Sequence, residues 1–487
     1  MKGANRGMNS AAVSEQQHPS NLGEVVIVDE VIVSGPSPRR ARNVILLLAA
    51  SVGLMMTGYG IIMPIFARRL GEFGSGVEAL GLMTMSFALA QLVAAPFMGS
   101  LADRYGRRPL VLVALAAFAA ANIGFLFATS TTALVVIRAL EGALTAGLFP
   151  AAMGVVADVV PEKQRAQWVG VVMGSYGAGF IFGPVVGGVL YDGWGYTAPF
   201  IASAIMAVIA FIAAVIMMPE TRTSTVRWRE ELRSRRFLAV ASQSETSLWA
   251  SLPRPLHVFG TLLILDFIGV FVFAFVEPQM VFYFYDELGW TTIQFGLVVG
   301  AYGLAMVFGQ LVLGRSSDRF GRKPIIVLGI LVSSSLYAGL VLVTRYPLML
   351  LVAAVAGLGS ALIAPALSSY YLDISDERYR SRILGIKESS AALGGVLGPL
   401  LLVGVSAVMM AQGVFIIAGA VMLAGVALAI VVLPAPGKVS EQTRDIAWEF
   451  SDKRALAAQS ALRGIVLSSS ANREARSAVN PTAYSPS

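Results

Sequence analysis

The sequence predicts an all-α membrane protein with twelve transmembrane helices in two pseudo-symmetric bundles of six. Three observations support this prediction: the composition, the spacing of the apolar runs and an internal repeat. Of the 487 residues, 56% are hydrophobic and only 13% are charged, whereas an average soluble protein has about 25% charged residues. A chain of this composition cannot cover itself with a hydrated surface, so lipid must form part of its solvent.

Twelve apolar runs approach or exceed the length of about 20 residues that a helix needs to cross a bilayer. The first six lie at 44–66, 77–101, 109–129, 131–154, 166–190 and 198–218. The second six lie at 257–284, 291–314, 324–344, 347–370, 381–404 and 410–433. These runs divide the chain into an extension (1–43), two bundles (44–218 and 257–433), a charged linker (219–256) and a polar tail (434–487) with a surface helix expected near 446–465.

The placement of lysine and arginine predicts the orientation in the membrane. Loops on one side, including the linker, hold most of the basic residues, and the loops on the other side hold only Arg68, Arg69 and Arg345. Basic loops stay in the cytoplasm. The extension lacks the features of a cleaved signal peptide. We therefore expect a multi-pass protein of the plasma (inner) membrane with both termini in the cytoplasm.

The composition also argues against several classes of site and partner. The chain has no cysteine and only two histidines, both outside the apolar cores of the runs, so neither a thiol nucleophile nor a metal site is expected. The net charge of +7 is spread over loops and forms no basic domain, so we expect no nucleic-acid partner. The expected partners are the lipid bilayer and a small-molecule substrate.

A constant shift of 215 residues relates the two halves of the chain. With this shift, identical residues coincide in the two halves: Asp103 with Asp318, Arg107 with Arg322, Asp158 with Asp373, and Gly183-Pro184 with Gly398-Pro399. A duplicated six-helix unit explains this offset. Such halves typically enclose a site near the membrane midplane and expose it to one side at a time.

Two copies of one loop motif lie at equivalent places in the halves. The first reads Gly-Ser-Leu-Ala-Asp-Arg-Tyr-Gly-Arg-Arg-Pro over 99–109, and the second reads Gly-Arg-Ser-Ser-Asp-Arg-Phe-Gly-Arg-Lys-Pro over 314–324. Aspartate and arginine four residues apart can hold one conformation through charge-assisted hydrogen bonds. Alternatively, the loop is a basic turn that only fixes the topology.

Together the two loops resemble the signature loop of the major facilitator superfamily, and the resemblance covers nearly all of 44–433. It implies a latch at the cytoplasmic face, which locks the outward-facing state, in each half. The first latch comprises Asp103, Arg104, Arg107 and Asp158, and the second comprises Asp318, Arg322 and Asp373. Ser316 and Ser317 replace Leu101 and Ala102 in the second copy, from which we expect a weaker latch there.

The run at 166–190 carries a glycine pattern, formed by Gly170, Gly179, Gly183, Pro184, Gly187 and Gly188. Spacings of three and four place Gly179, Gly183 and Gly187 on one stripe of a helix, which predicts close packing against a neighbouring helix. The pattern also resembles the antiporter motif of the twelve-helix drug:proton exporters of the superfamily. This resemblance implies export, driven by the proton gradient without a cofactor, by a monomer.

Ionisable residues inside apolar runs are costly in lipid and are therefore candidates for proton coupling. In the fourth run Arg138 and Glu141 stand three residues apart and can pair on one helix face. The pair is either a self-neutralised structural element or an arginine that tunes an acid. Glu141 departs from the glutamine of the family pattern, and Arg138 should hold it ionised.

The seventh run contains two more acids, Asp266 and Glu277. Eleven helical residues return to nearly the same face about 16 Å further along, so we expect Asp266 near the membrane middle and Glu277 nearer the outer leaflet. Asp266 has no cation in its own helix neighbourhood and is the first candidate for the proton carrier. Glu277 is either a second coupling acid or an interfacial residue, and Lys387 and Glu388 are expected to pair near the cytoplasmic surface.

Aromatic residues complete the expected site, with Tyr176, Phe271, Phe275 and Tyr302 as candidate substrate contacts. Aromatic faces beside a carboxylate suit lipophilic cations. The leading hypothesis is a proton-coupled efflux antiporter for lipophilic, cationic drugs. The alternatives are a proton-coupled transporter of a specific metabolite, such as a sugar or organic acid, and a non-transporting membrane sensor. An enzyme is not expected, because the sequence has no nucleotide-binding loop, no cysteine and no soluble domain.

Overall fold

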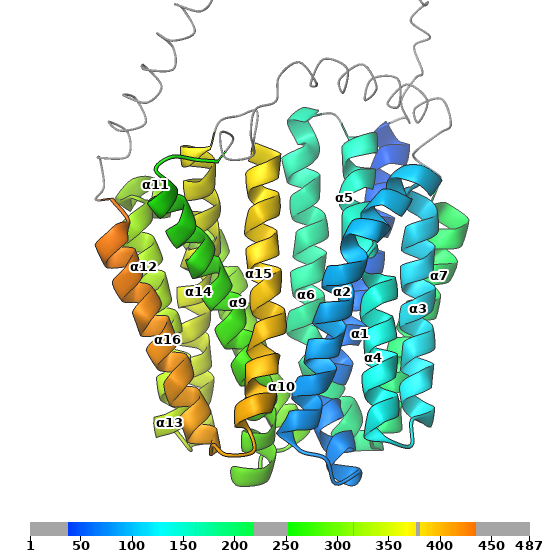
Figure 1. Ribbon diagram of the computed structural model, residues 1–487. Helices are drawn as coiled ribbons and strands as arrows, with labels where there is room; N and C mark the ends of the chain where they lie inside the picture. Colours follow the sequence, from blue (N-terminus) through cyan, green and yellow to red (C-terminus); the bar gives the residue numbers. More distant parts are fainter. Residues whose placement is uncertain (1–37, 161, 219–251, 315, 376–379, 435–487) are drawn as a thin grey trace, which may run out of the picture.

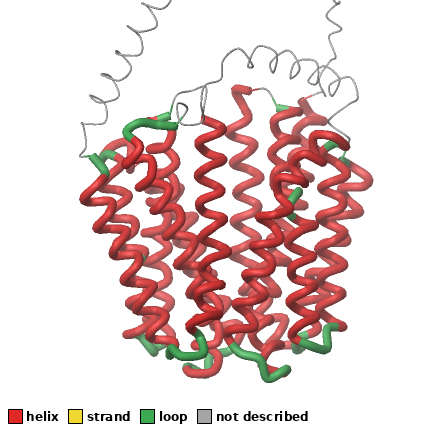
Figure 2. The backbone as a smooth tube through the Cα atoms, in the orientation of Figure 1, coloured by secondary structure: helices red, strands yellow, loops and turns green. Residues whose placement is uncertain are grey.

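The structure is a computed structural model that describes residues 38–160, 162–218, 252–314, 316–375 and 380–434. Over these ranges the chain consists of helices joined by short loops and contains no strand (Figure 2). Most of the predicted extension, linker and tail, including the surface helix expected near 446–465, lies outside the described residues.

Twelve helical spans of the described chain are long and apolar enough to cross a membrane, which confirms the prediction. The first bundle consists of α1 (Pro38–Glu72), α2 (Val77–Tyr105), α3 (Arg107–Phe127), α4 (Thr131–Thr145) continued by α5 (Leu148–Val159), α6 (Glu162–Trp194) and α7 (Thr197–Met217). The second consists of α9 (Leu256–Phe282) continued by the π-helix η2 (Tyr283–Glu287), α10 (Thr292–Leu313), the short α11 (Ser316–Phe320), α12 (Arg322–Ser333) continued by α13 (Ser335–Leu342), α14 (Tyr346–Ile374), α15 (Arg380–Val405) and α16 (Ala411–Val432).

The first helix is longer than the predicted run of 44–66. Arg68 and Arg69, which were expected in a loop, lie in its last turns because both side chains find partners there. Arg69 pairs with Glu72 and also donates to the carbonyl oxygen of Ala128 (3.1 Å). Arg68 donates to the carbonyl oxygen of Trp290 (2.9 Å). With these partners the helix continues beyond its apolar run.

The two bundles stand side by side and meet through pairs of helices that the repeat relates (Figure 1). Gly81 of α2 lies against α15, where an added Cβ would be 3.6 Å from the carbonyl oxygen of Pro399. Gly296 of α10 lies against the carbonyl oxygen of Pro184 in α6. The offset of 215 residues relates both members of these pairs, so the pseudo-symmetry of the sequence is also present in space.

We call the end of the molecule that carries Gly106, Gly321, Met217 and Leu256 the linker end (top of Figure 1), and the opposite end the far end. Polar contacts join the bundles at the far end. The Arg68 guanidinium, besides its bond to Trp290, lies 3.8 Å from the ring centroid of Tyr285. The Tyr285 hydroxyl donates to the carbonyl oxygen of Pro64 (3.0 Å). These contacts close the far end.

The glycines of α6 and α15 are packed differently along each helix. In α6 and α15, four glycines of the linker-end halves have no described atom within 4 Å of where a Cβ would stand: Gly170, Gly174, Gly177 and Gly385. The same helices are tightly packed nearer the far end, at Gly183 and Gly398. The close contacts of α6 and α15 within their own bundles therefore lie nearer the far end.

Candidate functional site

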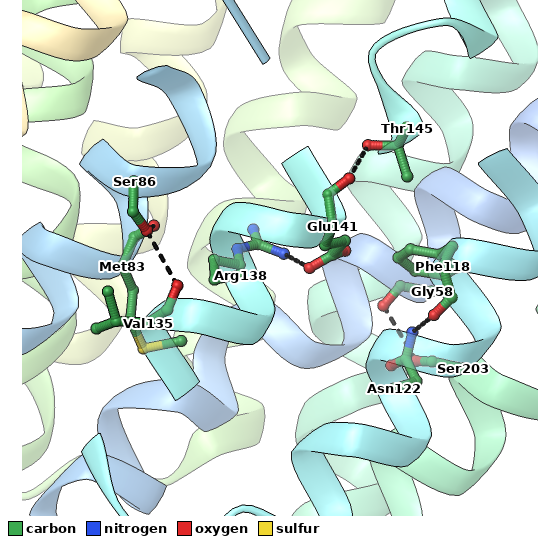
Figure 3. A network of polar contacts seen from close by, with 10 residues as sticks. All are labelled: Gly58, Met83, Ser86, Phe118, Asn122, Val135, Arg138, Glu141, Thr145 and Ser203. Carbon is green, nitrogen blue, oxygen red and sulfur yellow. Dashed lines mark hydrogen bonds and ion pairs between the residues drawn. The ribbon is translucent and has the colours of Figure 1, made fainter. Parts of the chain in front are cut away.

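A buried ion pair lies on α4 in the interior of the first bundle (Figure 3). Arg138 and Glu141 are only 5% and 2% exposed. The Arg138 Nη1 donates to the Glu141 Oε2 at 2.7 Å. The pairing that their spacing predicts is thus present. The Thr145 hydroxyl donates to the backbone carbonyl of Glu141 (2.7 Å), a contact that does not involve the Glu141 carboxylate.

Three aromatic rings surround the Arg138 guanidinium. The centroids of Phe87, Tyr59 and Phe66 lie 4.3, 4.6 and 5.3 Å from its central carbon. A cation within about 6 Å of a ring face is attracted by the ring quadrupole. The arginine is therefore held by a carboxylate on its own helix and by rings from α1 and α2. The sequence analysis missed these rings, because nothing in one sequence shows which aromatic residues of other helices face α4.

Glu277 of α9 brings a second carboxylate towards the same arginine from the other bundle. It interacts electrostatically with Arg138 and with Tyr59. The side chain is half-buried, and within the described part of the chain it forms no hydrogen bond or ion pair. Glu277 therefore faces the region between the bundles, and Arg138 stands between a bonded acid and an unbonded one.

Asp266 has a cation beside it on another helix. The Lys387 Nζ of α15 lies 4.0 Å from the Asp266 Oδ1 and 3.0 Å from the exposed Glu388. The Tyr371 ring of α14 also lies next to Asp266. The sequence analysis considered only the helix of Asp266 itself and missed Lys387, because α15 packs against α9. Asp266 lies in the linker-end half of the span Leu256–Glu287 rather than at its middle.

The arginine latches of the two loop motifs join helices within each bundle. The Arg107 Nε of α3 lies 3.6 Å from the Asp158 Oδ2 of α5. In the second bundle the Arg322 Nε donates to the Asp373 Oδ2 at 2.9 Å. The side chain of Asp103 lies outside the described residues, and Arg104 lies 5.6 Å from the Tyr105 ring.

Arg322 of the second latch has two more partners in its own loop. Arg322 also pairs with Asp318, and its Nη1 donates to the Ser317 hydroxyl at 2.8 Å. The serine that was expected to weaken the latch therefore adds a hydrogen bond to it. Both loops turn at a glycine with positive φ, 110° at Gly106 and 91° at Gly321, a conformation that side chains disfavour.

The basic residue after each latch arginine has a role that the sequence analysis missed. The Arg108 Nη2 donates to the carbonyl oxygen of Val215 at 2.6 Å, near the end of α7. The Lys323 Nζ donates to the carbonyl oxygens of Ile430 and Leu433, at 2.6 Å each, at the end of α16. Cations satisfy the unpaired carbonyls of a helix C-terminus. The signal was present in the sequence as a second pair of basic residues 215 positions apart.

The glycine pattern packs α6 against two other helices, in agreement with the close helix packing that its spacing predicts. A Cβ on Gly179 would lie 2.5 Å from the carbonyl oxygen of Gly53, and one on Gly183 would lie 2.7 Å from the Cα of Gly60. Gly187 lies against the Ile61 carbonyl in the same way. Gly188, in contrast, lies against the start of α10, and Gly170 takes no part in this packing.

The four candidate substrate contacts differ in accessibility. Tyr176 is 36% exposed, Phe271 is half-buried in a stack with Phe275 (5.9 Å between centroids), and the Tyr302 hydroxyl shares a hydrogen bond with Ser360 (2.7 Å). Phe275 is only 1% exposed and lies in the core beneath α15. It therefore packs the second bundle in this conformation instead of lining an open space, because the close approach of α15 covers it.

Comparison with known proteins agrees with this architecture. The chain is 30% identical over 369 residues to the class G tetracycline resistance protein of Vibrio anguillarum, an alignment that covers 74% of this chain and 89% of that protein. It is 25% identical over 403 residues to the quinolone resistance protein NorA of Staphylococcus aureus, covering 82% and 98%.

Among solved structures, the chain resembles a bacterial homologue of the human lysosomal transporter Spinster, in an inward-facing and occupied conformation, with a TM-score of 0.63 and 14% identity over 82% of this chain and 97% of that one. The human organic anion transporter MFSD10 (TETRAN) gives a TM-score of 0.59 and 22% identity over 81% and 100%. The Major Facilitator Superfamily profile matches residues 46–290 and 259–471. With its duplicated bundles and paired signature loops, the chain belongs to the Major Facilitator Superfamily of membrane transporters.

Proposed function

We propose that this protein is an efflux antiporter that exports lipophilic, cationic drugs in exchange for protons. The linker end faces the cytoplasm of the cell and both termini lie there, in agreement with the basic residues concentrated at this end. The resistance proteins against tetracycline and quinolone among its relatives support export of drugs, as does the glycine packing of α6. The proton gradient is the only energy source, and the monomer is the working unit.

One observation carries the proposed coupling: Glu277 faces Arg138 without forming a bond, while Glu141 binds the same arginine. An ionised carboxylate in an apolar interior is costly unless a cation or hydrogen-bond donors compensate it. Arg138 is already compensated by Glu141, so Glu277 is the acid that a proton or a cationic substrate can neutralise. Because only one of the two can occupy the carboxylate at a time, proton and drug exclude each other there, and exchange follows.

Asp266 takes a secondary part in this proposal. Its carboxylate has Lys387 at 4.0 Å, so it is partly compensated before any proton arrives. In this proposal Asp266 and Lys387 compensate each other's charge within the second bundle. This compensation changes as α9 and α15 move against the first bundle. Asp266→Asn should therefore weaken gradient-driven export less than Glu277→Gln does.

Ethidium retention in cells that express the protein tests the proposal. Cells with the wild-type chain should retain less ethidium than control cells, and collapse of the proton gradient should remove the difference. Glu277→Gln should abolish export. Glu78→Gln provides the matched control, because Glu78 is an exposed acid whose carboxylate only accepts a bond from the backbone of Gly76.

Two results would contradict the proposal. Equal ethidium retention with and without the protein, together with gradient-driven uptake of a sugar or organic acid, would assign the chain to metabolite transport. Wild-type export by Glu277→Gln, at equal amounts of protein in the membrane, would remove Glu277 from the coupling mechanism.

A further inference from the structure

A cavity of about 350 Å³ opens at the far end of the molecule, on the other side of the membrane from the linker end. Both bundles form its walls. The connection between α1 and α2 contributes Ser75, and the first residue of α2 is Val77. The end of α9 with η2 contributes Gln279, Tyr283, Asp286 and Glu287. No role assigned above uses this cavity.

Two carboxylates of the cavity have no cation. Asp286 and Glu287 are exposed, and within the described chain neither forms a hydrogen bond or an ion pair through its side chain. The two arginines at this end of α1 have other partners: Arg68 contacts the Trp290 carbonyl and the Tyr285 ring, and Arg69 pairs with Glu72. The cavity is therefore negatively charged.

A buried amide provides a second, independent sign of a ligand. Gln279 is only 8% exposed, it lines the cavity, and its side chain has no hydrogen-bond partner within the described residues. The amide is therefore available to bind a polar group that enters the cavity.

The backbone of this region is unusual as well. Tyr283–Glu287 forms a π-helix, a rare turn that occurs frequently at functional sites. It carries both carboxylates. The Tyr283 ring of this wall packs edge-on against Phe415 (5.2 Å between centroids).

We propose that the far-end cavity binds an organic cation with N–H groups, which arrives from the side opposite the linker end. Asp286 and Glu287 compensate its charge, the Gln279 oxygen accepts one of its N–H groups, and Val77 and Tyr283 contact its apolar part. Drug-sized ligands occupy pockets of about 300–1,000 Å³, so the cavity fits an organic cation better than a single metal ion, which would leave most of it empty.

Binding there has a mechanical consequence. Because the walls come from both bundles, the complete site exists only while the α1–α2 connection and the end of α9 stay together. A ligand that binds one conformation better than another shifts the equilibrium towards it. An occupant should therefore stabilise the conformation that is closed at the far end. This site goes beyond the proposed function, and it depends neither on proton coupling nor on the direction of transport.

The absence of cysteine from the chain allows a site-specific test with the purified full-length protein. Val77→Cys places one thiol in the cavity, and its rate of reaction with a maleimide is measured with and without ethidium. At ten times its Kd, a ligand that covers the thiol should slow labelling by about tenfold. Thr129→Cys is the matched control, because Thr129 is exposed at the same end but does not line the cavity, and its rate should not change.

Two further variants in the Val77→Cys background separate this cavity from the central site. Asp286→Asn with Glu287→Gln should abolish protection by ethidium, and Glu277→Gln should leave it intact. The proposal is overturned by absence of protection, by protection that survives loss of both cavity carboxylates, or by protection that disappears with Glu277→Gln. Protection by Ca²⁺ and not by ethidium would also overturn it in favour of a metal site. These labelling rates are measured without transport, so their interpretation stays the same even if the protein does not export drugs.

Discussion

Replacing Arg138 by methionine should destabilise the protein and abolish transport. The side chains of Arg138 and Glu141 are 6% and 1% exposed, so the variant leaves an unpaired carboxylate in the interior. Removing one partner of a buried ion pair costs about 3–5 kcal/mol. Part of this is the loss of attraction to Tyr59, Phe66 and Phe87, at about 0.5–1 kcal/mol per ring.

A second variant separates stability from function. Replacing both partners, Arg138→Met with Glu141→Leu, removes the uncompensated charge, and an apolar substitute for a buried pair is often neutral or stabilising. The double variant should therefore recover most of the unfolding free energy and still fail to transport. Glu141→Gln should be milder than Arg138→Met, because its amide oxygen can still accept the bond from Arg138.

Two measurements test these variants. The free energy of unfolding of the purified protein in detergent is measured by chemical denaturation, and transport is measured after reconstitution into liposomes. An unfolding free energy for Arg138→Met within 1 kcal/mol of wild type would show that the pair is not buried as described. Wild-type transport by the double variant would refute the role of Arg138 in coupling.

Three more predictions follow from the packing and the latches. Gly183→Val should abolish transport, because the valine side chain would clash with the backbone of α1. Gly174→Ala in the same helix meets no described neighbour and should transport normally. The flux of the reconstituted variants tests both expectations. Ser317→Ala should reduce the transport rate and Ser316→Ala should not, since Ser317 bonds the latch arginine; equal rates would contradict this. Arg68→Ala should shift the protein towards opening at the far end, measured as a longer distance between spin labels on the two bundles, and an unchanged distance distribution would count against it.

The fold could be predicted almost completely from the sequence, because lipid imposes simple rules. Each span must be apolar for about 20 residues, and a duplicated unit repeats its features at a fixed offset. The offset even predicts packing: Gly142 lies against the Phe87 carbonyl, and their counterparts Gly357 and Tyr302 make the same contact. Length was less predictable at the end of α1, where Arg68 extends the helix by binding the other bundle.

The candidate site was predictable only where its residues share a helix. Arg138 and Glu141 stand three positions apart, so their contact follows from helix geometry. The rings around Arg138 and the approach of Glu277 come from other helices, and helix periodicity carries no information on which faces meet. The same limit applies to Asp266, whose neighbour Lys387 belongs to α15.

Proteoliposomes with an imposed pH gradient provide the most direct test of proton-coupled export. Ethidium carries a permanent charge, so a pH gradient alone cannot trap it. If Glu277 exchanges protons for cations, an acidic lumen should drive ethidium inward while protons leave, and Glu277→Gln should retain downhill ethidium exchange but lose the response to the gradient. Ethidium flux that ignores the gradient in the wild-type protein, or that responds fully in Glu277→Gln, would contradict the account.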